Sequence, residues 1–345
     1  MSNMNISPEE REVTPRLPQC TGGTKVEIIT SRDVPLGGPR AMRVKRTLPQ
    51  RQRSLIGAWC FCDHYGPDDV STTGGMDVAP HPHMGLQTVS WLFEGSIMHN
   101  DSAGYHAVVK PGEANFMTAG HGICHSETST QDTTSLNGVQ LWVALPDKAR
   151  HMKRRFENYR PTAHHFDGGE ALVFMGTLFG QTSPISSFTP LVGAEIRLDT
   201  GTEVTFDVDP EFEHGVLLDR GAVNLEGVDV QRSELAYTGV GAKTLTLTNT
   251  GADRARVVLI GGKPFTEPIV MWWNFVGRTH EEIVKARNEW QARSERFGVV
   301  EGYVGHHHDG PSWLPAPHLP NAKIRSRVNP SPVARPEMRI DQPRA

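Results

Sequence analysis

The sequence predicts an all-β protein made of two consecutive units of the same kind. Glycine (34 residues) and proline (25 residues) are frequent in this chain of 345 residues, which favours short elements joined by turns over long helices. Short apolar runs separated by turn signals every 8–12 residues are typical of β-sandwiches and barrels. Two such stretches, at 25–147 and 170–300, follow each other, so we expect a duplicated barrel.

The first unit begins with the alternating run VEIIT at 26–30. Three later apolar runs predict strands: QTVSWLF (87–93), HAVVK (106–110) and GVQLWVAL (138–145). Tight turns are expected between them, because DSAG at 101–104 and KPG at 110–112 carry the residues that turns require.

The second unit follows a basic and aromatic stretch at 148–169, which we interpret as a linker. Its expected strands lie within 170–179, 194–209, 214–230, 243–250 and 255–262. Hairpin signals such as Asp199-Thr-Gly201 and Asp219-Arg-Gly221 fall where these strands must reverse.

One helix is predicted near the end of the second unit. Thr279 and Glu282 have the spacing of a capping box, with threonine at the N-cap position. Ile283, Ala286 and Trp290 then form an apolar stripe that would pack on a sheet. We expect Gly298 to end the helical region.

The two ends of the chain look unlike the units between them. Residues 1–24 are predicted to form a flexible arm. Residues 301–345 are rich in proline and are expected to be extended or disordered, and residues 305–345 are expected to be dispensable for folding. The triple histidine at 306–308 lies in this tail, where we expect no catalytic role.

Composition excludes several classes of protein. With 35 basic and 39 acidic residues, the chain offers no electrostatic reason to bind nucleic acid directly. No apolar run approaches the length that spans a membrane, and the polar N-terminus does not resemble a targeting signal. Four cysteines in so long a chain fit a reducing compartment, so we expect a cytoplasmic protein.

The histidines provide the main functional signal. His81 and His83 are two residues apart, so on a strand both side chains point to the same face. His125 and Glu127 repeat this arrangement about forty residues later. If the two strands lie side by side, three imidazoles and one carboxylate surround a point. Such a donor set suits Fe(II), Mn, Co, Ni, Cu(II) or Zn.

The other candidates are weaker. His99, His106 and His121 could line the mouth of a pocket, but solvated loop positions are favoured for them. Cys60 and Cys62 lack the spacing of a zinc or thioredoxin site and are expected to be core thiols.

The segment HPHMGLQTVSWLFEGSIMHNDSAGYHAVVKPGEANFMTAGHGICHSE (81–127) resembles the signature of the pirin family within the cupin superfamily. The resemblance continues through EFEHG (211–215) and GGKPFTEPIVMWWNFVGRTHEEI (261–283), and it covers about 25–300. It implies a bicupin, in which two antiparallel jelly-roll barrels pack together and a C-terminal helix follows. It also implies one metal, usually iron, held in the first barrel by His81, His83, His125 and Glu127.

Three positions depart from family patterns. Met84 and His121 stand where pirins often carry arginine, so we expect less positive charge near the mouth of the site. Gln87 occupies the place of the glutamate ligand of other cupins, which leaves Glu127 as the carboxylate. The second barrel offers Glu213-His214 but no pair two residues apart, so we expect it to bind no metal.

The resemblance implies a dioxygenase that acts with O2 on flavonol-type substrates such as quercetin, with Glu127 as the general base. Its partners would then be a small aromatic molecule and O2. An alternative is a metal- or redox-dependent regulatory protein that binds transcription factors or metabolic enzymes without turnover. A third is a metal-dependent isomerase of the cupin type, or a protein that has lost its activity.

Overall fold

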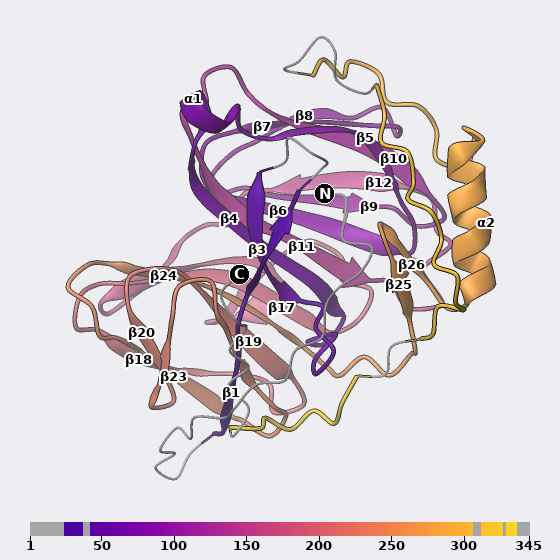
Figure 1. Ribbon diagram of the computed structural model, residues 1–345. Coiled ribbons are helices and arrows are strands. Elements are labelled where there is room, and N and C mark those ends of the chain that lie inside the picture. The colour runs from indigo at the N-terminus through magenta and orange to yellow at the C-terminus, as the bar shows by residue number, and fades with distance from the viewer. Residues whose placement is uncertain (1–23, 37–41, 306–311, 327–328, 337–345) are drawn as a thin grey trace.

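The computed structural model describes residues 24–36, 42–305, 312–326 and 329–336. Two antiparallel barrels are stacked as four layers of sheet, with the first barrel uppermost in Figure 1 and the second below it. This confirms the all-β bicupin fold that the sequence predicts.

The first barrel consists of a seven-stranded sheet and a four-stranded sheet. The larger sheet has the order β12-β9-β6-β11-β4-β3-β2. Its strands are β2 (Arg32–Pro35), β3 (Arg43–Leu48), β4 (Trp59–Asp69), β6 (Leu86–Glu94), β9 (Ala114–Thr118), β11 (Ser135–Ala144) and β12 (Arg155–Tyr159). The smaller, outer sheet has the order β5-β10-β7-β8. It contains β5 (Asp77–His83), β7 (Ile97–Asp101), β8 (His106–Val109) and β10 (Ile123–Ser129). A single helical turn, α1 (Val70–Thr73), connects β4 to β5.

The second barrel repeats this plan. Its seven-stranded sheet has the order β1-β22-β19-β24-β17-β14-β13. The strands are β1 (Val26–Ile29), β13 (His164–Phe166), β14 (Gly169–Met175), β17 (Leu191–Leu198), β19 (Glu213–Arg220), β22 (Leu235–Thr238) and β24 (Ala255–Gly262). The outer sheet is β18 (Glu203–Asp207), β23 (Thr244–Asn249), β20 (Val223–Leu225) and β21 (Val228–Val230). Two short hairpins lie outside these sheets: β15 (Thr177–Leu178) with β16 (Gln181–Thr182), and β25 (Val270–Trp272) with β26 (Phe275–Gly277).

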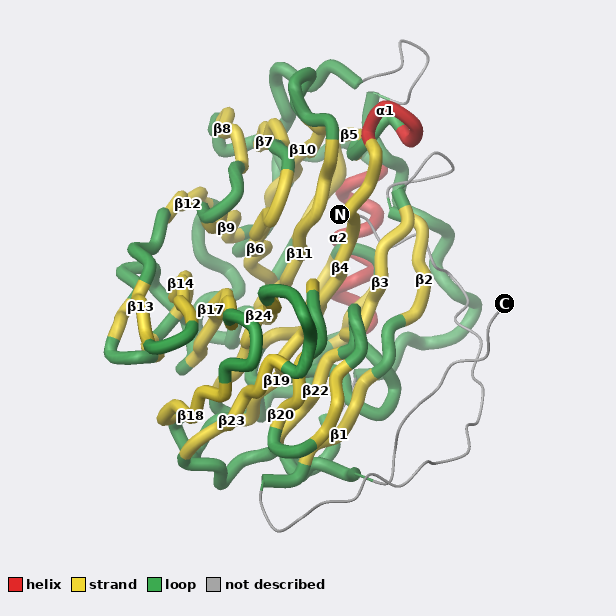
Figure 2. Tube along the Cα trace, turned by 90° about the vertical axis from the view of Figure 1, so that its left-hand side faces the viewer, coloured by secondary structure: helices red, strands yellow, loops and turns green. Residues whose placement is uncertain are grey.

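The two seven-stranded sheets pack face to face (Figure 2). Side chains alternate between the faces of a strand, and on β11 the apolar residues Val139 and Leu141 join an interface cluster with Leu217 and Val258 of the second barrel. The residues between them, such as Gln140, therefore face the interior of the first barrel. This alternation determines which side chains can reach a site inside that barrel.

Strand pairing shifts the boundaries expected from the sequence. β1 lies in the sheet of the second barrel, where it pairs with β22, and so does not belong to the first unit. The expected linker contains two strands, because β12 pairs with β9 of the first barrel and β13 pairs with β14 of the second. Edge strands supply open hydrogen-bonding groups for such pairing, and a pattern of single segments does not reveal which edge a strand joins.

Helix α2 (His280–Gln291) packs beside the first barrel, on the right in Figure 1. Thr279 is its N-cap and accepts a hydrogen bond from the backbone N–H of Glu282. The predicted stripe of Ile283, Ala286 and Trp290 is buried. The helix ends at Gln291, earlier than expected from Gly298, because Arg293 takes a left-handed φ of 55°. Among the described residues, no helix has the length and apolar character that crossing a bilayer requires.

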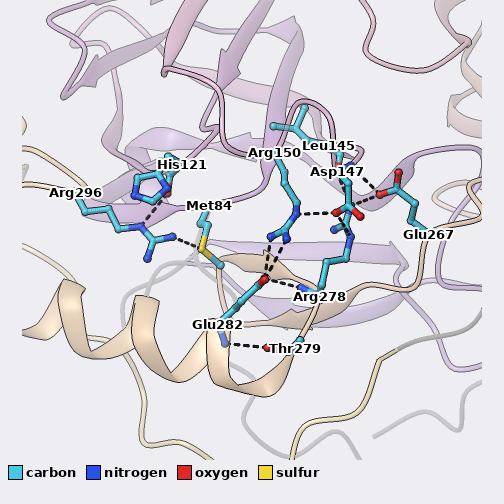
Figure 3. A network of polar contacts seen from close by, with 10 residues as sticks. All are labelled: Met84, His121, Leu145, Asp147, Arg150, Glu267, Arg278, Thr279, Glu282 and Arg296. Carbon is cyan, nitrogen blue, oxygen red and sulfur yellow. Dashed lines mark hydrogen bonds and ion pairs between the residues drawn. The ribbon is translucent and has the colours of Figure 1, made fainter.

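A polar network fixes the N-terminal end of α2 to the first barrel (Figure 3). The Arg150 guanidinium binds both carboxylate oxygens of Glu282, at 2.9 and 3.1 Å. Glu282 also accepts the backbone N–H of Arg278 at 2.8 Å. In a capping box, the side chain of this glutamate would accept the backbone N–H of the N-cap residue. Here it binds Arg150 and the backbone of Arg278 instead. The glutamate therefore attaches the helix to the barrel.

The described parts of the tail follow an extended path without helix or strand. Leu314 is buried, and its backbone lies between α2 and β5: its N–H donates to Pro80 O and its O accepts from Trp290 Nε1. Further on, Pro332 O accepts the N–H of Val240 in the second barrel. The tail therefore contacts both barrels. The triple histidine at 306–308 lies outside the described residues.

Candidate metal centre

Three neighbouring strands of the outer sheet of the first barrel carry the candidate ligands. β10 lies between β5 and β7, so its residues face partners on both sides. His125 stands opposite His81 on β5, and Glu127 stands opposite His99 on β7. The two predicted pairs thus come together as expected, because their strands are hydrogen-bonded neighbours.

His81, His83 and His125 form one compact group. Their side chains are fully buried, and one ring nitrogen of each lies within 4.8 Å of one of each of the others. The Nε2 atoms of His83 and His125 are 3.0 Å apart. Nitrogen atoms converging at such distances inside a protein are typical of a metal site.

Glu127 belongs to a second, overlapping group. Its carboxylate lies within 4.8 Å of ring nitrogens of His99 and His125, and all three residues are buried. His125 is common to both groups. The four residues predicted as ligands therefore lie in one region, with Glu127 grouped beside His125 and His99 rather than with all three predicted histidines.

Burial makes these imidazoles good ligands. It holds the pKa values of His81, His83 and His125 well below the usual 6.5, because a charged ring would lose its hydration. Neutral rings keep a lone pair for a metal. In His81 the Nδ1 atom lies 2.9 Å from the carbonyl oxygen of Ala79, so Nδ1 carries the proton and Nε2 carries the lone pair.

The sequence reasoning misjudged His99. We expected a solvated loop histidine, but His99 lies on β7, is 3% exposed and contacts both His125 and Asp101. A signal was available: His99-Asn-Asp101 has the same two-residue spacing as the other two pairs. Turn residues immediately after Asp101 concealed it, because they suggested that the strand had already ended.

Polar side chains from the larger sheet face the same interior. Ser90 Oγ donates to Gln140 Oε1 at 2.8 Å and lies 3.5 Å from Glu127 Oε1. Burial, and then the charges of Glu127 and Asp63, hold the pKa of Tyr65 well above its usual value, so its phenol stays protonated. The Tyr65 hydroxyl has no hydrogen-bond partner within the described part of the chain.

Other candidates lie away from this interior. His106 is exposed on β8, where its Nδ1 lies 2.7 Å from Asn100 Oδ1. Cys60 and Cys62 are buried thiols, as expected. Gln87 donates to Thr118 Oγ1 at 3.0 Å. In the second barrel, Glu213 accepts from Gly57 N and Tyr237 Oη, whereas His214 lies on the opposite face of β19.

Positive charge is present near the two positions that lack arginine. The Arg296 guanidinium donates to the carbonyl oxygen of His121 at 2.9 Å and lies 2.7 Å from Met84 Sδ (Figure 3). His121, Arg154 and Arg296 also line a surface cavity of about 700 Å³. The expectation of less positive charge is therefore wrong for this surface, because the segment after α2 supplies an arginine.

Comparisons with known proteins agree with this architecture. The family model named Pirin matches residues 41–143, and the model named Pirin C-terminal cupin domain matches residues 193–298. The chain is 39% identical to a Pseudomonas aeruginosa protein named "Putative quercetin 2,3-dioxygenase", over 80% of this chain and 87% of that protein. It is 34% identical to a pirin-like protein of Caulobacter vibrioides, over 72% of this chain and 88% of that protein.

A solved structure shows the same fold. The crystal structure of quercetin 2,3-dioxygenase from Acinetobacter baumannii superimposes with a TM-score of 0.81 at 38% identity. The match covers 88% of this chain and 98% of that one. One family model matches each barrel, and the chain belongs to the pirin family.

Proposed function

We propose that this protein is a metal-dependent dioxygenase that acts with O2 on flavonol-type substrates, and that His81, His83, His125 and Glu127 hold its metal. One observation carries the proposal: three buried, neutral imidazoles present ring nitrogens within 4.8 Å of one another inside the first barrel. The similar architecture of a quercetin 2,3-dioxygenase at 38% identity supports the reaction class.

The donor set fits a divalent transition metal. His81 directs an Nε2 lone pair toward the group, and the Nε2 atoms of His83 and His125 stand only 3.0 Å apart. At that distance either one nitrogen donates a hydrogen bond to the other or a cation lies beside both lone pairs. Nitrogen donors with one carboxylate suit Fe(II), our first candidate, and also Ni, Mn, Co, Cu or Zn.

The surrounding residues suit proton transfer from a phenolic substrate. The bound metal would supply Lewis acidity and a template for orienting substrate and O2. Glu127 would accept the proton of the flavonol 3-hydroxyl group as general base. Tyr65, which stays protonated and has an unused hydroxyl, can donate a hydrogen bond to a substrate oxygen in the same interior.

The test combines metal analysis with oxygen uptake on a panel of flavonols. Protein lacking 306–308 should hold about one metal equivalent per chain, as expected for a single site with His and Glu ligands. Glu127→Gln should keep metal on the three histidines but lose roughly 10²–10⁴-fold in turnover, the usual contribution of a positioned base. The residual rate should rise with pH, because the substrate hydroxyl then ionises unaided.

Glu203→Gln is the matched control, since Glu203 is exposed on β18 of the second barrel. It should leave both metal content and turnover unchanged. Full activity in Glu127→Gln would exclude Glu127 as the base. Absence of oxygen uptake in every metal form of the wild type would reject the dioxygenase and favour the alternative, a metal-dependent binding protein.

A further inference from the structure

A chain of three side chains extends behind the candidate ligand His125. Its Nδ1 atom lies 3.3 Å from Nδ1 of His99, and Nε2 of His99 lies 3.0 Å from Oδ2 of Asp101. The other oxygen of Asp101 accepts the backbone N–H groups of Ala103 (2.8 Å) and Tyr105 (3.2 Å). All three side chains are buried, so solvent does not compete for these contacts.

These contacts fix where the protons lie. The Asp101 carboxylate is an acceptor only, so Nε2 of His99 must carry a hydrogen. In its neutral form, which the proposal takes as its premise, His99 has one N–H, and this leaves its Nδ1 as an acceptor. His125 must then donate from its own Nδ1. Its Nε2 consequently bears the lone pair, and this is the atom that faces His83 at 3.0 Å.

We propose that His99 and Asp101 are positioning residues that hold His125 in the tautomer required for metal binding. Asp101 sets the tautomer of His99, and His99 in turn sets that of His125. The inference rests on the proposed metal site. It adds His99 and Asp101 to that site as residues that act through His125 without contacting the metal. Partners of this kind orient ligands and raise their basicity in known metal sites.

The local packing supports a fixed geometry. The His99 ring stacks on Phe156, with centroids 4.9 Å apart and planes 29° apart. Asp101 is held by the turn that follows it, and β7 and β10 are paired directly, with His125 opposite Asp101 and Glu127 opposite His99. Both ring nitrogens of His99 are thus engaged. An alternative in which His99 itself binds the metal requires it to give up one of these contacts.

Asp101→Asn tests the tautomer directly. The amide oxygen can still accept from the turn, while the amide N–H₂ would donate to Nε2 of His99. His99 would then have to donate from Nδ1, and His125 would carry its proton on Nε2, where it blocks coordination. We expect about 10–100-fold weaker Ni(II) or Co(II) affinity in chelator competition. In metal-free protein, ¹⁵N NMR of labelled histidine should show that His125 has changed tautomer.

The double variant His99→Asn with Asp101→Asn distinguishes this role from the alternatives. The amide introduced by His99→Asn can place its oxygen where Nδ1 of the imidazole was and accept again from His125. Metal affinity should therefore recover most of what Asp101→Asn loses. If His99 were a ligand, or if both residues only supported the fold, the double variant would bind metal more weakly than Asp101→Asn, which would overturn the inference.

His106→Asn is the control, because His106 is exposed and lies on the neighbouring strand β8. It should leave affinity and NMR spectra of His125 unchanged. Unchanged affinity and tautomer in Asp101→Asn would reject the positioning role while leaving the metal site intact. Absence of metal binding by the wild type would instead reject the proposed function, and the NMR measurement on metal-free protein would still decide the tautomer.

Discussion

The outer sheets of the two barrels have equivalent strand orders. They differ in the side chains that they direct inward, which are polar in the first barrel and apolar in the second. In the first barrel, β5, β10 and β7 each direct polar side chains inward as a pair two residues apart. In the second barrel, β18, β23 and β20 direct Phe206, Leu245, Leu247 and Leu225 inward, and these join an apolar cluster. One backbone plan therefore supports either a polar site or a closed apolar core.

This difference indicates that the two barrels contribute differently to the stability of the protein and to the candidate site. Burying a polar group without a partner costs roughly 2–7 kcal/mol, and within the described residues the Tyr65 hydroxyl is such a group in the first barrel. The second barrel has a continuous apolar interior and offers the first an apolar face across the interface. We infer that the apolar interior of the second barrel stabilises the molecule, whereas the interior of the first holds the candidate metal centre.

The largest expected effect is on metal binding, and it compares one histidine from each barrel. His83→Ala removes a candidate ligand from the group of three, whereas His214→Ala removes a buried histidine that belongs to neither candidate metal group among the described residues. We expect His83→Ala to lose most bound metal and His214→Ala to keep it. Elemental analysis after dialysis against a weak chelator measures both. Equal losses would show that the barrels have been assigned the wrong roles.

The site was more predictable than the assembly around it. Spacing of two residues on a strand determines which face a side chain takes, so His81 with His83 and His125 with Glu127 could be paired from sequence alone. Strand neighbours depend on contacts far apart in the chain. The sequence therefore did not reveal that β1 closes the second barrel, or that β7 places His99 beside Glu127.

The tail shows the same limit. Its prolines predict an extended chain, and the described parts are extended, but its docking depends on partners elsewhere. Leu314 is covered by α2 and β5, and the side chain of Asn329 accepts the backbone N–H groups of Ser54 and Leu55. Composition indicates the conformational preferences of a segment itself. It does not indicate which surfaces elsewhere in the protein the segment will contact.

The second prediction concerns this tail, and it replaces our expectation that the tail is dispensable. Ending the chain at Val304 removes the burial of Leu314, worth roughly 1.5–3 kcal/mol, and hydrogen bonds to both barrels. The ordering entropy of the segment offsets part of this. We expect the melting temperature to fall by about 3–10 °C, since about 2–4 °C corresponds to 1 kcal/mol in domains of 150–250 residues.

A chain ending at Pro336 is the control for this truncation, because it keeps every described contact of the tail. Its melting temperature should match that of the full chain. Metal affinity should fall in the shorter chain as well, since Leu314 N donates to the carbonyl of Pro80, which precedes His81. An unchanged melting temperature after truncation at Val304 would show that the tail is dispensable for folding.

The third prediction is a pH dependence to which the second barrel contributes through His214. Burial lowers the pKa of His214 to about 4, although Asp209 acts in the opposite direction. Below pH 6.5 the unfolded chain binds a proton at this position, while the folded chain does not until about pH 4. Stability that is fully present above pH 6.5 is thus lost as the pH falls toward 4, by about 3 kcal/mol at most. His214→Gln should remove this part of the acid sensitivity and leave the part due to the buried histidines of the first barrel. His165→Gln should remove none, since its imidazole is 76% exposed. Urea unfolding of metal-free protein at pH 7 and pH 4.5 measures the difference.

The same acid sensitivity in His214→Gln as in the wild type would mean that the buried histidines of the first barrel account for all of it. The polar interior alone would then limit the stability of the protein in acid.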